Sequence, residues 1–159
     1  MAKVVIETNN PQVYGKYSWW QVGLVGAALG VVTLALSWII SVFIVDPLLC
    51  RTGTLAACGQ SEVLAGNIGA VVSAIIGAGI LIRLRVRRSL WVVIAVLATF
   101  WGITTLIADL RWAEMAAWMA GLYAVGYLLF ANILRIRSAF VAAIIAIIAV
   151  LVLRWVAFL

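Results

Sequence analysis

The sequence predicts an all-α, polytopic membrane protein, a bundle of five transmembrane helices. Of its 159 residues, 67% are hydrophobic and only 10% are charged, and the mean hydropathy is +1.24. A soluble domain of this size needs far more polar surface. The apolar residues also fall into uncharged runs of about 20 residues, the length of helix that crosses a hydrocarbon core of roughly 30 Å. Short basic clusters separate several of these runs.

The first run carries no charge from Trp19 to Val45, and we expect it to stop at Asp46-Pro47. Proline lacks a backbone N–H and disfavours helical geometry in the residue before it. The later runs are bounded by arginines or acidic residues. The predicted spans are about 19–45, 62–82, 89–108, 112–134 and 138–157.

The boundary between the third and fourth spans has neither glycine nor proline. A single helix over 90–134 would be about 67 Å long, twice the thickness of the bilayer. We therefore expect the chain to reverse near Asp109, Arg111 and Glu114.

The fifth run has 16 uncharged residues, Ser138 to Leu153, before Arg154. A long arginine side chain near a helix end reaches the interface, so this run is still expected to span. The alternative is a bundle of four spans, with the last segment re-entrant or interfacial.

Orientation follows from the excess of lysine and arginine on the cytoplasmic side of membrane proteins. One side of the alternation receives eight basic residues and the other receives three, Arg51, Arg111 and Arg154. We expect the protein to lie in a plasma membrane, specifically a bacterial inner membrane. Residues 1–18 would form a cytoplasmic tail and residues 19–159 a single transmembrane domain. The carboxyl terminus and the loop after the first span would lie outside.

The net charge of +6 is explained by this orientation, so nucleic acid is not expected as a partner. Basic residues near the inner membrane surface attract anionic lipid headgroups. A cytoplasmic protein docking on the same residues is the alternative. The residues in question are Arg83, Arg85, Arg87, Arg88, Arg135 and Arg137.

The two cysteines, Cys50 and Cys58, both fall in the loop after the first span. A cysteine pair on the oxidising side of a membrane is typical of a structural disulfide. Redox catalysis is less expected, because the chain has no C-x-x-C motif. We predict a Cys50–Cys58 bridge.

Small residues recur at helical spacing within the spans. Lipid tails are as apolar as leucine, so transmembrane helices associate by close backbone approach along such stripes. The stripes can pack helices within one subunit or between subunits. The candidate packing residues are Gly23, Gly26, Gly30, Gly69, Ser73, Gly77 and Gly121.

Six of the eight tryptophans lie near predicted span ends, where the indole ring suits the headgroup level. Trp38 and Trp101 lie deeper. We expect these two side chains to fill space between helices rather than to contact a ligand.

Chemistry inside a membrane needs polar groups at membrane depth, and here they are few. The chain has no histidine and no acid or base near the centre of a span, so we expect neither an enzyme nor a metal or cofactor site.

Thr33, Ser37 and Ser41 form one helix face and are the best candidates to line a solute path; helix packing is the alternative. Four acidic residues are expected at the outer surface and could form a vestibule or a partner-docking ring; the alternative is a rim of solvated side chains. They are Asp46, Glu62, Asp109 and Glu114.

The function expected from these features is assembly. The protein would be a small integral membrane subunit or scaffold that acts by helix packing, as a homo-oligomer or within a larger membrane complex. The alternative is a channel or facilitator for a small solute or ion.

Overall fold

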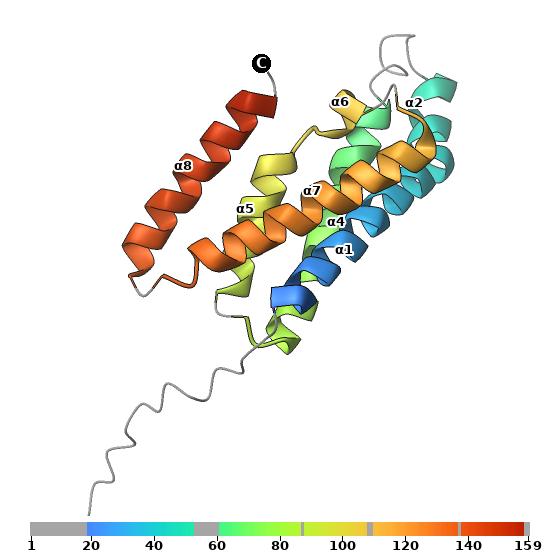
Figure 1. Ribbon diagram of the computed structural model, residues 1–159. Helices are drawn as coiled ribbons and strands as arrows, with labels where there is room; N and C mark the ends of the chain where they lie inside the picture. Colours follow the sequence, from blue (N-terminus) through green and yellow to red (C-terminus); the bar gives the residue numbers. More distant parts are fainter. Residues whose placement is uncertain (1–18, 53–60, 87, 108–109, 137, 158–159) are drawn as a thin grey trace, which may run out of the picture.

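The computed structural model describes residues 19–52, 61–86, 88–107, 110–136 and 138–157, and these residues form helices joined by short turns (Figure 1). In chain order the elements are α1 (Trp19–Ile40), the π-helix η1 (Ser41–Val45), α2 (Asp46–Thr52), α4 (Ser61–Arg83), α5 (Ser89–Phe100), α6 (Thr104–Ile107), α7 (Trp112–Ile133) and α8 (Ala139–Ala157).

Three helical stretches are long and apolar enough to cross a membrane: Trp19–Leu48, Ser61–Arg83 and Trp112–Ile133. The described residues contain helices and no strands, which confirms the all-α class. The three stretches match the first, second and fourth predicted spans and suggest a membrane location. Two further apolar helices are shorter, Ser89–Phe100 and Phe140–Val156, so the predicted count of five spans is not confirmed.

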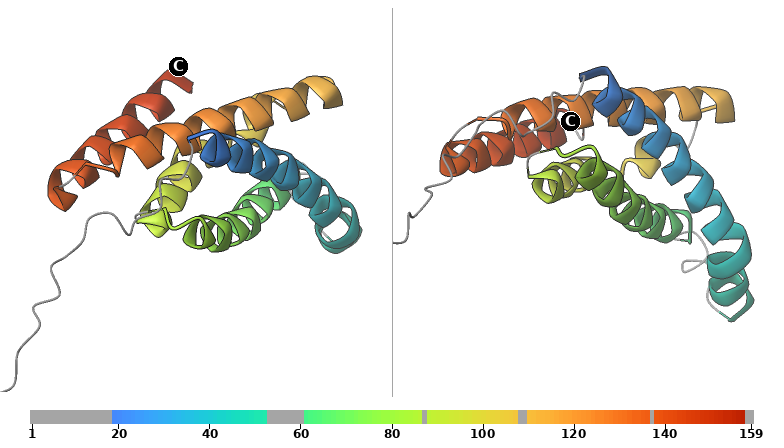
Figure 2. Two further views of the ribbon diagram at one scale, coloured as in Figure 1. Left: turned by 60° about the horizontal axis from the view of Figure 1, so that its bottom comes forward. Right: turned by 90° about the horizontal axis from the view of Figure 1, so that it is seen from below.

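Helix α1 is the centre of the arrangement and packs against both α4 and α7. Helix α5 contacts α4 and α7 on one side and α8 on the other. Helix α8 therefore lies at the edge of the bundle, and two further views show it beside the end of α7 (Figure 2).

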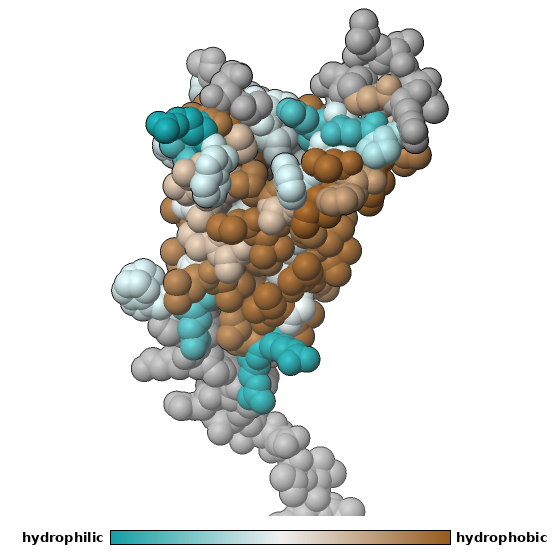
Figure 3. Space-filling model, turned by 90° about the vertical axis from the view of Figure 1, so that its right-hand side faces the viewer, coloured by the Kyte–Doolittle hydropathy of each residue, from teal (hydrophilic) through white to brown (hydrophobic). Residues whose placement is uncertain are grey.

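The surface seen from the side of α1, α2 and α4 has a brown apolar band with hydrophilic residues at its two ends (Figure 3). Large apolar side chains such as Leu24, Phe43 and Ile75 are more than 60% exposed. Soluble monomers rarely expose a continuous apolar surface of this kind. The distribution supports a location in a membrane.

The first helix does not stop at Asp46-Pro47, so that predicted end is wrong. The chain passes through η1, where the Asp46 N–H donates to the carbonyl of Ser41, five residues back. Pro47 then falls in the first turn of α2, where a missing N–H costs little. The wider π turn absorbs the proline without ending the helix.

The third predicted span is interrupted. Helix α5 has 12 residues and would be about 18 Å long, well short of the hydrocarbon core. Gly102 breaks it with a positive φ of 81°, and the Thr105 hydroxyl donates to the Gly102 carbonyl at 2.8 Å. The expected reversal is confirmed, because α7 begins at Trp112 and runs back across the bundle (Figure 1).

The expectation for the two deep tryptophans is also wrong. Trp38 is 65% exposed and Trp101 is 40% exposed, so neither ring is enclosed between helices. Small residues occupy the closest helix contacts, and there is no room for an indole ring there.

Substitutions at Gly102 test the break. Gly102→Val should lower the free energy of unfolding in mixed detergent by about 1–3 kcal/mol, because a β-branched residue is strained at positive φ. Gly102→Asn should cost less, since asparagine tolerates the left-handed region. Equal losses for the two variants would contradict a left-handed turn at this position.

Candidate functional site

The contact between α1 and α7 depends on glycines of α1. A Cβ atom placed on Gly26 would lie 2.8 Å from the Tyr123 carbonyl oxygen and 2.9 Å from the Ala124 Cα. On Gly30 it would lie 2.7 Å from the Met119 carbonyl carbon, and on Gly23 it would lie 3.2 Å from Leu128 Cδ1. As residue numbers rise along α1 they fall along α7, so the two helices are antiparallel and in backbone contact.

A second seam joins α1 to α4. A Cβ atom on Gly69 would lie 2.6 Å from the Ser37 Oγ, and one on Gly77 would lie 2.8 Å from Leu29 Cδ1. Between these contacts Thr33 meets Ser73. The pairs advance four residues on one helix and retreat four on the other, one helical turn at each step. The small-residue stripe predicted on α4 therefore packs against α1 within the subunit.

The hydroxyl groups of this seam form a buried network. Thr33 and Ser73 are each 1% exposed. The Thr33 hydroxyl donates to the Leu29 carbonyl at 2.7 Å, which uses its one hydrogen. At 2.6 Å from Thr33 Oγ1, the Ser73 hydroxyl is then the donor of the interhelical bond. The network links α1 and α4.

The three candidates for a solute path are not equivalent. Thr33 and Ser37 lie buried between helices, and the Ser37 hydroxyl donates to the Thr33 carbonyl at 2.7 Å. Ser41 lies in η1 and turns to the Asp46 carboxylate, with oxygen separations of 3.3 and 3.4 Å. The arrangement is that of a hydrogen-bonded helix interface.

Gly121 differs from the other six predicted packing residues. It is exposed, and a Cβ atom placed on it would have no neighbour within 4 Å among the described residues. Ala113 and Ala117 precede it at intervals of four and are also exposed. We call Ala113, Ala117 and Gly121 the outer stripe of α7. The stripe is a small-residue surface that the subunit does not use for its own packing.

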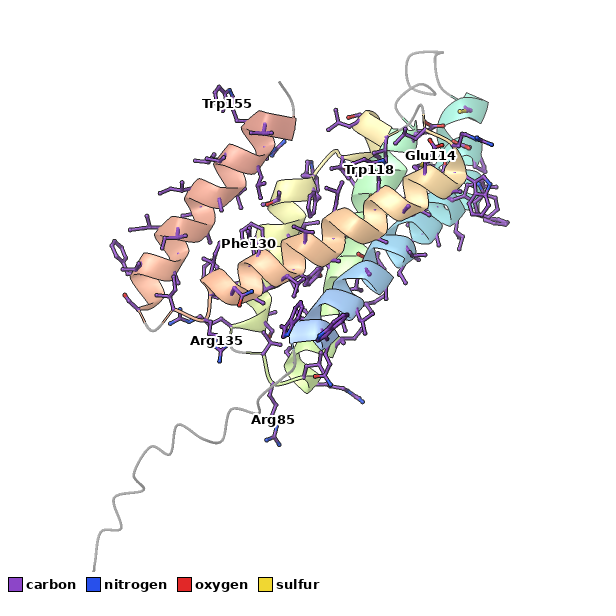
Figure 4. The ribbon with its side chains drawn as sticks, in the orientation of Figure 1. Arg85, Glu114, Trp118, Phe130, Arg135 and Trp155 are labelled. Atoms are coloured by element: carbon purple, nitrogen blue, oxygen red, sulfur yellow. The ribbon has the colours of Figure 1, made fainter. Side chains whose placement is uncertain are left out.

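The acidic residues lie at the ends of helices. Glu62 is in the first turn of α4, and Glu114 is in the first turn of α7 (Figure 4). Both are exposed, whereas Asp46 is half-buried at the start of α2 and Asp109 lies outside the described residues. No group of three or more acidic, cysteine or histidine side chains able to hold a metal occurs in the described part of the chain.

Four of the candidate headgroup arginines are described, Arg83, Arg85, Arg88 and Arg135, while Arg87 and Arg137 lie outside the described residues. Arg85 and Arg88 adopt positive φ values of 55° and 58° in the turn between α4 and α5. The labelled side chains of Arg85 and Arg135 project from the same end of the bundle (Figure 4). The two connectors thus bring their basic residues together at one end.

Cys50 lies near the end of α2 with an exposed side chain. Its predicted partner Cys58 falls outside the described residues. The Cys50–Cys58 bridge therefore stays a prediction.

Some residues of the bundle interior were missed by sequence reasoning. Gly126 meets Phe100, whose ring stacks on Tyr123 at 5.2 Å between centroids. Tyr127 reaches Gly77 with its hydroxyl and is 2% exposed. The available signal was the spacing of Tyr123 and Tyr127, four residues apart on one face of a helix with Gly126 beside them.

Substitution of Gly30 tests the α1–α7 contact. Gly30→Ala should lower the free energy of unfolding in mixed micelles by about 1–3 kcal/mol, because the added methyl meets the α7 backbone. Gly79→Ala is the control, since a Cβ atom on Gly79 has open space. A Gly30 variant as stable as the control would contradict the close contact.

A double-mutant cycle tests the hydroxyl pair. Thr33→Val and Ser73→Ala should each lower stability by about 0.5–1.5 kcal/mol, since each removes one partner of a buried hydrogen bond. The double variant should lose less than the sum of the single losses, by about 0.5 kcal/mol or more. Additive losses in SDS unfolding would contradict a coupled pair.

Searches among protein-family models, curated proteins and solved structures found no match to this chain. What the protein does must follow from its own residues and their contacts.

Proposed function

We propose that the protein is a small integral membrane subunit that assembles with copies of itself through the outer stripe of α7. The observation that carries the proposal is Gly121, which has no neighbour within 4 Å of a built Cβ atom among the described residues. The other six candidate packing residues contact a neighbouring helix of the same subunit. Gly121, with the outer stripe to which it belongs, is therefore available for contact with another chain.

The physical reason is the same one that packs α1 inside the subunit. Helices in a bilayer gain little from burying apolar side chains, and close backbone approach at small residues stabilises their association. Ala113, Ala117 and Gly121 offer about two turns of such a surface on α7. A second copy of the chain supplies the same surface, so a symmetric α7–α7 contact is self-complementary.

The proposed orientation places the arginines between α4 and α5 and after α7 in the cytoplasm, where they anchor the subunit on anionic lipid. The exposed acids Glu62 and Glu114 would form part of the outer rim. A bacterial inner membrane is the proposed location. A larger membrane complex is the alternative partner for the same stripe.

Assembly is proposed in preference to catalysis or conduction. The hydroxyl groups of Thr33 and Ser37 are buried and engaged in hydrogen bonds, which favours a structural role for them. A channel or facilitator remains the second hypothesis from the sequence, and solute flux in liposomes would select it.

Gly121→Ile tests the assembly surface. The bulky side chain should separate the α7 helices. It should lower the dimerisation constant in liposomes, obtained from single-molecule photobleaching, about tenfold, or roughly 1.4 kcal/mol. Gly79→Ile is the matched control, because Gly79 is equally exposed but lies on α4. A monomeric parent chain, or equal losses in the two variants, would overturn the proposal.

A further inference from the structure

An apolar groove of about 200 Å³ runs between α5 and α8. Trp91, Ala95 and Ala98 line its α5 side, and Ala143, Ile147 and Leu151 line its α8 side. The α8 contribution runs from Ala143 to Leu151, eight steps of 1.5 Å, so the groove is about 12 Å long. It is open on one side.

Alanines create this groove. Ala95 and Ala98 on α5 face Ala143 on α8, so side chains that would fill the space between the helices are missing. In a bilayer the surroundings of such a groove are hydrocarbon, and a lipid acyl chain fits its shape and polarity. The shape of the groove alone would accept the acyl chain of any lipid, because all such chains are as apolar as the side chains that line it.

Selectivity comes from the charges at one end of the groove. Arg88 precedes α5, and its carbonyl accepts the Trp91 N–H at 3.0 Å. Arg135 follows Leu134, another residue of the lining. Figure 4 places Arg135 at the end of the bundle where α7 ends and α8 begins. Arg88 and Arg135 therefore lie next to one end of the groove, outside its apolar lining.

These arginines have no nearby acidic residue in the sequence. Residues 63–108 and 115–159 contain no aspartate or glutamate. The Arg88 Nη1 is buried, and it has no hydrogen-bond partner in the part of the chain that the structure describes. Because that atom is shielded from the surface, a phosphate would pair with the accessible part of the half-buried Arg88 guanidinium. Phosphate oxygen is the acceptor that arginine binds best.

We propose that the α5–α8 groove holds one acyl chain of an anionic phospholipid whose phosphate pairs with Arg88 and Arg135. The groove selects the chain by shape, and the arginines select the headgroup by charge. The site is separate from the outer stripe of α7, so either proposal can fail without the other.

Native mass spectrometry of the full chain, titrated with phosphatidylglycerol or phosphatidylcholine of identical acyl chains, tests the site. The parent chain should retain one phosphatidylglycerol in preference to phosphatidylcholine. Arg88→Asn combined with Arg135→Gln should weaken phosphatidylglycerol binding about 30-fold, since each basic residue near an anionic headgroup contributes about fivefold. Asparagine suits the positive φ of Arg88.

The control for charge is Arg83→Gln combined with Arg85→Asn. It removes two arginines from the same connector, one of them also at positive φ. It should weaken the general attraction of this end to anionic lipid, while retention of the single groove-bound phosphatidylglycerol changes less than threefold. Equal losses in the two double variants would overturn the site in favour of general attraction to a basic surface. So would equal binding of the two lipids by the parent chain.

The control for shape is a pair of tryptophan substitutions on α8. Ala143→Trp fills the groove and should lower binding about tenfold, whereas Ile145→Trp, outside the lining, should leave it unchanged. Equal effects would overturn the groove. If Ala143→Trp instead dissociates a dimer and leaves lipid binding intact, the groove is a docking site for a second copy and the lipid proposal is wrong.

Discussion

The close antiparallel approach of α1 to α4 and α7 is the constraint on which the rest of the structure depends. In a bilayer the burial of apolar side chains adds little, so the bundle needs backbone contact. Gly26 and Gly30 permit it toward α7, and Gly69 permits it toward α4. A side chain at any of these positions would collide with backbone or hydroxyl atoms of the neighbouring helix.

The polar network follows from this approach. Thr33 and Ser73 share a hydrogen bond because their helices lie close enough for two short side chains to meet. Measured bonds of this kind contribute modestly, about 0.6 kcal/mol on average. Their larger effect is on register, because a slide of one turn would separate Thr33 from Ser73 and leave two buried hydroxyls without interhelical partners.

The outer part of the bundle is built differently. Helix α5 ends at Phe100, and α8 contacts chiefly α5, so the α5–α8 pair is less enclosed than the three long helices. The groove lies in this part of the bundle, beside Leu134 after the end of α7, whereas the outer stripe lies in the first half of α7. The enclosed seams account for the stability of the fold, while the open surfaces are where lipid and further copies of the chain are proposed to bind.

The sequence by itself determined the all-helical class, the membrane setting and most helix boundaries, because hydropathy and charge act locally along the chain. It also marked the small residues at which helices meet. Only the tertiary structure decided that Gly26 and Gly30 contact α7, that Gly69 contacts α4, and that Gly121 contacts neither. The same is true of the break at Gly102, the π-helical passage into Pro47 and the outward position of Trp38. Each of these depends on which distant segment lies alongside, and a small residue at helical spacing looks the same in sequence whichever neighbour it meets.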